Sequence, residues 1–230
     1  MKMKKTFYTE SAYIFGILAL ALGAALMTTA DFGLSMVIAP AYLLHLKLSQ
    51  YFPFITFGVA EYMLQALLLL AIIVILHRFR IAYLMSFVTA VLYGYILDGF
   101  LFLLSFVGTP DILLRVAFYL AGLFSTALGV AFVFRTYLPP EAYELFVKEM
   151  SSKFHLNINR FKLLYDISSC LISVVMAFCF FRLWHFEGIK LGTFICAAVN
   201  GKLIEYIGMF LDKRFDFCDR LQLRKKLWQQ

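Results

Sequence analysis

Long apolar stretches separated by short polar segments make up most of this chain of 230 residues. Each stretch reaches the ~20 residues that a helix needs to cross the hydrocarbon layer of a membrane. The expected spans lie at 11–30, 57–76, 82–107, 112–134, 163–183 and 189–211. The sequence therefore predicts an all-α, polytopic membrane protein with a single membrane domain over residues 1–230. The first span lacks a small-residue cleavage site, and we expect it to be retained.

The chain repeats at a spacing of about 106 residues. The matched positions are Gly16 with Gly122, Gly23 with Gly129, Glu61 with Asp166, Gly94 with Gly201 and Asp98 with Glu205. The two copies, residues 11–107 and 112–211, each contain three expected spans. An odd number of spans per copy turns the second copy upside down relative to the first, an architecture common among secondary transporters. We therefore expect six transmembrane helices in two inverted three-helix repeats.

A short connector after the first span of each copy also predicts a helix. Residues 31–48 are too apolar for a solvated loop, and we expect a short helix in the membrane interface or re-entering the protein. Residues 139–154 begin with two prolines and combine early acids with an apolar stripe, which is typical of an amphipathic helix on the membrane surface. Two interpretations stay open for both: covers over the ends of a central cavity, or plain interfacial connectors.

The net charge of +7 is unevenly distributed. Lysine and arginine gather in the N-terminal tail, the second and fourth loops and the basic tail 212–230. The positive-inside rule then puts both termini in the cytoplasm. We expect the tail to contact the anionic lipids of the bilayer rather than nucleic acid. A homodimer stays open as the assembly.

No sequence motif indicates an enzyme, a metal centre or a cofactor. The four cysteines form no CxxC pair, and the four histidines are scattered near span ends. Neither a Walker loop nor a dinucleotide-binding glycine turn is present. The serine pair Ser168-Ser169 has no histidine or lysine base beside it in the sequence. We therefore expect a protein that is not an enzyme and holds no cofactor.

Ionisable side chains within the spans are the first functional candidates, since each costs ~2.5–3.5 kcal/mol to insert on translocon scales. The predicted topology places Glu61 and Asp98 toward the outside, and Asp166 and Glu205 toward the cytoplasm. Lysines precede the inner pair by about one helical turn, so we expect that pair to be neutralised. Two alternatives stay open for the outer pair: Arg115 or Lys190 folds over it, or it is unpaired and serves as a proton or cation site. With nearby small and polar residues, the candidate solute or ion site comprises Glu61, Asp98, Asp166, Glu205, Gly94, Gly201, Lys202, Asn200, Thr193 and Tyr93.

The pattern Gly192-Thr193…Gly201…Glu205, with Gly94…Asp98 in the first copy, resembles six-span bacterial membrane proteins of the YitT/YczE type. The resemblance covers about residues 11–211. It implies a location in the bacterial inner membrane and a presumed role in transport. We therefore hypothesise a small-solute or ion permease with its site at the repeat interface. The alternative is a non-transporting accessory or lipid-binding protein that acts through a partner, whose interior should be solidly packed.

Overall fold

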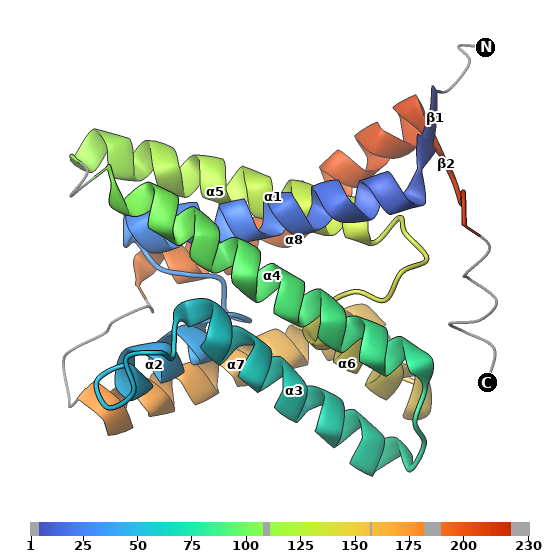
Figure 1. The fold of residues 1–230 in the computed structure, drawn as a ribbon. Helices are drawn as coiled ribbons and strands as arrows, with labels where there is room; N and C mark the ends of the chain where they lie inside the picture. The colour runs from blue at the N-terminus through green and yellow to red at the C-terminus, as the bar shows by residue number, and fades with distance from the viewer. Residues whose placement is uncertain (1–4, 108–110, 157, 182–189, 222–230) are drawn as a thin grey trace.

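The computed structural model describes residues 5–107, 111–156, 158–181 and 190–221 and is almost entirely helical (Figure 1). Six helices are long and apolar enough to cross a membrane: α1 (Thr9–Ala30), α3 (Phe57–Leu76), α4 (Ile81–Ser105), α5 (Ile112–Val133), α7 (Ile158–Phe181) and α8 (Leu191–Arg214). The other elements are two shorter helices and two strands, α2 (Ala39–Leu48), α6 (Ala142–Lys153), β1 (Lys5–Tyr8) and β2 (Phe215–Cys218).

The six long helices confirm the predicted number of membrane spans. Helix α3 has the predicted bounds, and α1, α4 and α5 agree with the prediction to within two residues. The span ends predicted at 183 and 189 lie outside the described residues. The continuous apolar runs account for this agreement, because an interrupted backbone is too costly in hydrocarbon for a span to stop early.

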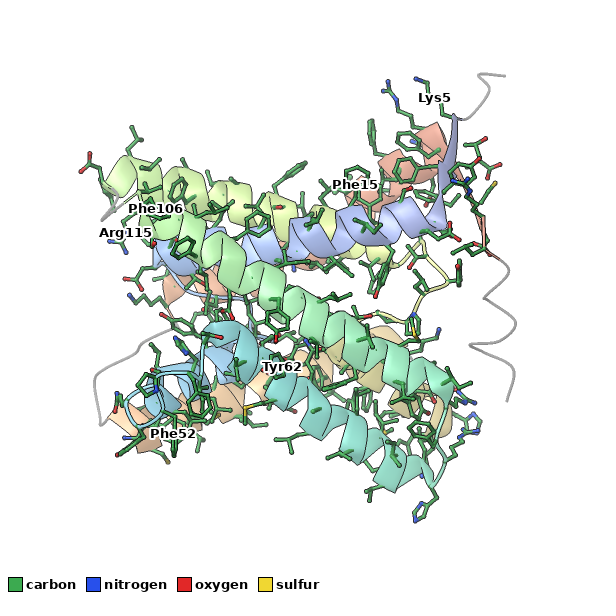
Figure 2. All side chains as sticks on the ribbon, in the orientation of Figure 1. Lys5, Phe15, Phe52, Tyr62, Phe106 and Arg115 are labelled. Atoms are coloured by element: carbon green, nitrogen blue, oxygen red, sulfur yellow. The ribbon has the colours of Figure 1, made fainter. Side chains whose placement is uncertain are left out.

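The bundle has two ends, which we name after the short helix that each contains. The α2 end holds the last turns of α1, α4 and α7 and the first turns of α3, α5 and α8, whereas the α6 end holds both strands (Figure 1). Figure 2 shows Phe52, Phe106 and Arg115 toward the α2 end and Lys5 at the opposite end. Both ends of the described chain therefore lie on one side of the bundle.

Helices α1 and α5 cross closely because both carry glycines at the crossing. Gly23 faces Gly122, and a Cβ atom on Gly23 would lie 2.8 Å from the Gly122 carbonyl oxygen. Gly129 faces Gly16, where a Cβ atom would lie 2.7 Å from the Gly16 carbonyl oxygen. Only residues without a side chain let two backbones approach this closely. The repeated glycine pairs seen in the sequence thus form the contact between the first helices of the two copies.

Helices α3 and α4 are also joined at a glycine crossing. A Cβ atom on Gly58 would lie only 2.1 Å from the Gly94 carbonyl oxygen, and one on Gly94 would lie 2.7 Å from the Gly58 carbonyl oxygen. Helices α7 and α8 are the corresponding second and third long helices of the second copy. Within their described residues they do not pack closely along each other; α7 packs on α2 and α6, and α8 on α5.

The short helices α2 and α6 each start near the middle of the bundle and run outward. Helix α6 begins beside Gln65, near the middle of α3, whose side chain accepts a hydrogen bond from the Ala142 N–H at 2.9 Å. It ends where the Lys153 ammonium donates to the Ile75 carbonyl at the end of α3. Likewise, the Ser169 hydroxyl in mid-α7 donates to the carbonyl of Met36, just before α2, at 2.8 Å. We call α2 and α6 the half-helices.

The predicted surface position of residues 139–154 is wrong, because α6 enters the bundle. Its apolar stripe packs against α3 and α4 rather than lipid, with Leu145 and Met150 fully buried beside Leu69 and Ile72. The alternative predicted for residues 31–48, a re-entering helix, describes α2. An amphipathic pattern does not distinguish burial against protein from burial in a membrane interface.

The chain ends are held together by a small parallel sheet that the sequence did not predict. Strand β1 pairs with β2 in the register Lys5 to Phe215. The ring of Phe7 contacts those of Phe15, Phe132, Phe215 and Phe217. Part of the segment 212–230, predicted as a lipid-binding tail, is therefore built into the fold. Residues 222–230, which carry its last basic residues, lie outside the described part.

Candidate functional site

A cavity of about 320 Å³ lies at the centre of the bundle, where the starts of the half-helices meet. Residues 35–38 before α2 and Pro140 and Glu141 before α6 form part of its wall. Its side walls come from α1, α4, α5, α7 and α8. The polar side chains among the lining residues are Ser35, Thr89, Tyr93, Thr126, Glu141, Tyr143, Glu144, Lys162, Asp166 and Asn200.

Polar side chains of α4 fix the turn that leads into α6. The Ser86 hydroxyl donates to the Pro140 carbonyl at 2.7 Å, and the Thr89 hydroxyl lies 3.4 Å from the Pro139 carbonyl. Two successive prolines provide no N–H groups of their own, so this turn depends on the long helices for its position. The beginning of α6 is thus held at the cavity by side chains of α4.

Carboxyl groups outnumber basic groups around the cavity. Lys162 forms an ion pair with Glu144, with 2.5 Å between the ammonium nitrogen and the carboxylate oxygen. Asp166 lies one helical turn further along α7, and its carboxyl interacts electrostatically with both Lys162 and Glu144. Glu141 has Glu144 as its charged neighbour. The charges of these two neighbouring carboxyl groups repel each other when both are ionised.

Four buried polar atoms of the cavity residues have no hydrogen-bond partner among the described residues. They are Glu141 Oε1, Tyr143 Oη, Asp166 Oδ1 and Asn200 Oδ1. Buried polar groups in folded proteins nearly always have a partner, and an exception needs an explanation. Because these atoms come from α6, α7 and α8 and line one space, a ligand or water inside the cavity would satisfy them together.

The carboxyl group of Glu61 does not line the cavity but is buried directly behind its wall. Glu61 of α3 is fully buried, and its Oε1 atom accepts a hydrogen bond from Gln65 at 3.4 Å. Tyr143, which lines the cavity, is a neighbour of Glu61, with its hydroxyl close to the carboxyl but outside hydrogen-bond geometry. Gln65 therefore connects the buried acid to the start of α6, which it also holds.

The cavity is closed toward the α2 end. The Tyr119 hydroxyl donates to the Gly192 carbonyl at 2.6 Å, and the Gly192 N–H donates to the Phe32 carbonyl at 2.9 Å. Asp31 accepts ion pairs from Arg115 and Lys190 just outside this point. These contacts join α1, α5 and α8 into a seal.

The cavity lining is exposed at the end of α5 and in the middle of α8. Phe134, a lining residue at the end of α5, is 51% exposed. At Gly201, also a lining residue, an added Cβ atom would have no neighbour within 4 Å. The opening of the cavity therefore lies beside α8, where the described residues of α7 and α8 do not pack closely on each other.

Comparison with protein-family models gives a match over residues 7–209. The chain belongs to the family of unknown function DUF6198. The match includes every residue that lines the cavity. Comparison with curated proteins and with solved structures found no match. Membership of DUF6198 thus covers all six long helices except the last turn of α8, without supplying an activity.

Four of the predicted site residues line the cavity of this DUF6198 protein: Tyr93, Asp166, Asn200 and Gly201. Glu61 lies directly behind its wall. Thr193 is fully buried in the seal, in contact with Gly33. Gly94 lies at the crossing of α3 with α4. Lys202 and Glu205 are exposed on α8 and are not among the lining residues.

The structure does not gather the predicted carboxylates into two equivalent pairs. Glu61 contacts Gln65 and the start of α6, whereas Asp98 contacts the start of α3. Lys162 bonds to Glu144 rather than to Asp166. The sequence interpretation missed Glu141, Tyr143 and Glu144 as site residues, although a proline pair followed by acids at a helix start was a visible signal.

Asp98 serves as a cap for α3, which predicts its mutational effect. Its carboxylate accepts hydrogen bonds from the Thr56 hydroxyl at 2.5 Å and the Gly58 N–H at 2.8 Å. We expect Asp98→Ala to lower the free energy of unfolding by about 1–2 kcal/mol, as for the loss of a helix cap. Glu205→Ala, at the matched exposed position of α8, should change it by less than ~0.5 kcal/mol. Denaturant unfolding of the purified variants measures both values; equal effects would contradict the capping role.

Proposed function

We propose that this protein is a permease that carries a small polar solute or ion through the central cavity. The observation that carries the proposal is a cavity of about 320 Å³ at the meeting point of two half-helix starts, lined by unpartnered polar atoms. Interrupted helices that meet at mid-depth are recurrent binding elements of secondary transporters. A lipid-binding or partner-binding accessory needs no such internal space, so we favour transport over that alternative.

The proposed permease consists of two inverted repeats, residues 11–107 and 112–211. Two sets of contacts support this. In the repeat, position 16 matches 122 and position 23 matches 129. Exchanging the two copies therefore converts the contact of Gly16 with Gly129 into the contact of Gly122 with Gly23, and the structure has both contacts. In the same way, α2 packs on α7 and α6 packs on α3. A two-fold axis in the membrane plane produces such exchanged contacts; an experimental structure whose halves align only about the membrane normal would contradict it.

The difference between the two halves suggests how the cavity changes sides. Helices α3 and α4 are closed on each other at Gly58 and Gly94, while the described residues of α7 and α8 do not pack closely on each other. In an inverted repeat, exchanging these two arrangements would close the present opening and create one at the α2 end. We propose that transport consists of this exchange, which is the alternating access of repeat-based transporters.

The proposal also assigns the orientation of the protein in the membrane and the membrane in which it lies. The basic loops at the α6 end support a cytoplasmic position for both termini by the positive-inside rule. The resemblance of Gly192-Thr193…Gly201…Glu205 to the YitT/YczE type supports the bacterial inner membrane and a role in transport rather than an enzymatic one. The present opening of the cavity would then face the cytoplasm.

Thiol labelling at position 200 tests the proposal. In a variant whose four native cysteines are replaced by serine, we expect Asn200→Cys to react with a charged, membrane-impermeant thiol reagent. Val199→Cys is the matched control, since Val199 is 41% exposed on the outer surface of α8 and would face lipid. Labelling in inside-out and right-side-out vesicles measures access from each side.

The proposed exchange predicts labelling of Asn200→Cys from both sides, faster from the cytoplasmic side, with the control at least tenfold slower. Labelling from one side only, under all conditions, would indicate a binding protein rather than a permease. No labelling from either side would show that water does not enter the cavity, and the proposed function would be wrong.

A further inference from the structure

The charges around the cavity do not balance. Four carboxyl groups lie in or directly behind its wall, those of Glu61, Glu141, Glu144 and Asp166. Lys162 is the basic residue among the lining side chains, and it is bonded to Glu144. The charged neighbours of Glu61 and Glu141 are other acids. Because a buried carboxylate needs a positive partner or hydrogen-bond donors, these acids lack part of their environment.

The unpartnered atoms point to the same missing component. Three of the unpartnered atoms are oxygens: Glu141 Oε1, Asp166 Oδ1 and Asn200 Oδ1. With the two carboxyl groups ionised, all three act as hydrogen-bond acceptors and none as a donor. Tyr143, which is 3% exposed, adds a hydroxyl that can donate or accept. Three acceptors from three helices match a ligand that presents several N–H groups in different directions.

An anion fits this space less well, despite the two helix starts. Backbone N–H groups at a helix start attract anions. At α6, however, Gln65 already accepts from the Ala142 N–H, and Glu141 and Glu144 surround the same turn. An added anion would lie among like charges, since the ammonium of Lys162 is already paired.

A bare metal ion is also a poor match. Among the described residues, no group of three or more histidine, cysteine, aspartate or glutamate side chains converges as metal ligands would. The volume of about 320 Å³ is at the lower end of the range for small organic ligands. Ile17, Leu20, Val130 and Ile204 supply an apolar wall. Tyr93 is a further lining residue, and aromatic rings attract cations.

We propose that the cavity binds a small organic cation that carries several N–H donors, a primary ammonium or a guanidinium group on a short hydrocarbon chain. Glu141 and Asp166 balance its charge, the Asn200 carbonyl accepts a further N–H, and the hydrocarbon lies against the apolar wall. This assignment specifies the substrate class of the proposed permease and rests on that function.

A matched set of four-carbon compounds tests the assignment. The full-length protein in detergent is titrated with n-butylamine, 1-butanol and sodium butyrate at pH 7.5, and binding is followed by calorimetry and by the melting temperature. We expect n-butylamine to bind and to raise the melting temperature, because a ligand that binds the folded state stabilises it. The alcohol and the carboxylate should bind at least tenfold more weakly.

Variants identify the groups responsible. Glu141→Gln and Asp166→Asn should each weaken n-butylamine binding at least tenfold. Asp111→Asn, an exposed acid at the start of α5 and outside the cavity, is the matched control and should bind as the parent does. Asn200→Leu removes an acceptor without changing the charge and should weaken binding about fivefold to tenfold, so the test survives if an acid variant does not fold.

Two outcomes would overturn the assignment. One is binding of 1-butanol or butyrate as tight as that of n-butylamine; the other is unchanged n-butylamine binding in a folded Glu141→Gln/Asp166→Asn double variant. Neither result affects the labelling of Asn200→Cys, which tests the proposed permease independently. Labelling from both sides would still support the permease. Failure of that labelling would reject the permease even if the amine binds.

Discussion

Leucine at position 94 is expected to lower the melting temperature of the protein by roughly 10 °C, whereas leucine at position 201 should leave it within about 2 °C of the parent. Both changes place the same side chain at matched glycines of the third helix in each copy. The gain in helix propensity, ~0.8 kcal/mol, is the same at both positions. Any difference between the two variants therefore reports on packing.

The contacts of the two glycines are the physical reason. A Cβ atom on Gly94 would lie 2.7 Å from the Gly58 carbonyl oxygen and 3.1 Å from Tyr62 Cδ1, so leucine must force α3 and α4 apart. At Gly201 there is no atom within 4 Å of the added Cβ. Overpacking of a helix crossing costs on the order of 3 kcal/mol or more, while a side chain in open space costs little.

Thermal unfolding of the two purified variants in one detergent gives the comparison. Gly201→Leu should in addition slow the labelling of Asn200→Cys, because the new side chain narrows the opening beside α8. Equal destabilisation by the two leucines would mean that α7 and α8 pack as closely as α3 and α4. The difference between the halves, and the proposed exchange of their arrangements, would then have no basis.

Replacement of Gln65 by leucine is expected to lower the free energy of unfolding by about 2–4 kcal/mol. Gln65 is fully buried; its oxygen accepts the Ala142 N–H at 2.9 Å, and its nitrogen donates to Glu61 at 3.4 Å. Leucine leaves both the backbone N–H and the buried carboxyl without these partners. Each unsatisfied buried group costs about 1–3 kcal/mol, and more if it is charged.

A double-mutant comparison separates the two losses. Glu61→Gln, which keeps a polar group opposite Gln65, should change stability by about 1 kcal/mol or less. In a Glu61→Leu background, Gln65→Leu should cost less than it does in the parent, because no buried carboxyl is then left unpaired. Denaturant unfolding of the parent and the four variants measures these differences. An unchanged stability of Gln65→Leu alone would show that the side chain does not hold the start of α6.

The sequence predicted the long helices well because each membrane span is a local property. Twenty or so apolar residues predict a crossing without reference to any distant part of the chain. The repeated glycine pairs were also visible in the sequence. They did not reveal that Gly23 meets Gly122 while Gly16 meets Gly129, because the partner of a glycine depends on the relative direction of two helices.

The candidate site was predicted only in part, for a related reason. Asp166, Asn200, Gly201 and Tyr93 were singled out as charged, polar or small residues within apolar spans, and they line the cavity. Glu141 and its neighbours were missed because their segment reads as a surface helix. Whether its acids face water or an internal space depends on α3 and α4, which hold that turn from more than fifty positions away in the sequence.

The pairing of β1 with β2 affects the order in which the protein can be assembled during synthesis. Residues 5–8 emerge from the ribosome first, yet their partners, residues 215–218, follow only after all six long helices have been made. The Glu10 carboxylate likewise waits for the N–H groups of Arg220 and Leu221. The fold can therefore be completed only after translation has passed residue 221, and until then α1 remains without its final contacts at the α6 end. A nascent chain stalled before that point should expose the Phe7 side chain, and with it a segment that chaperones or proteases can recognise.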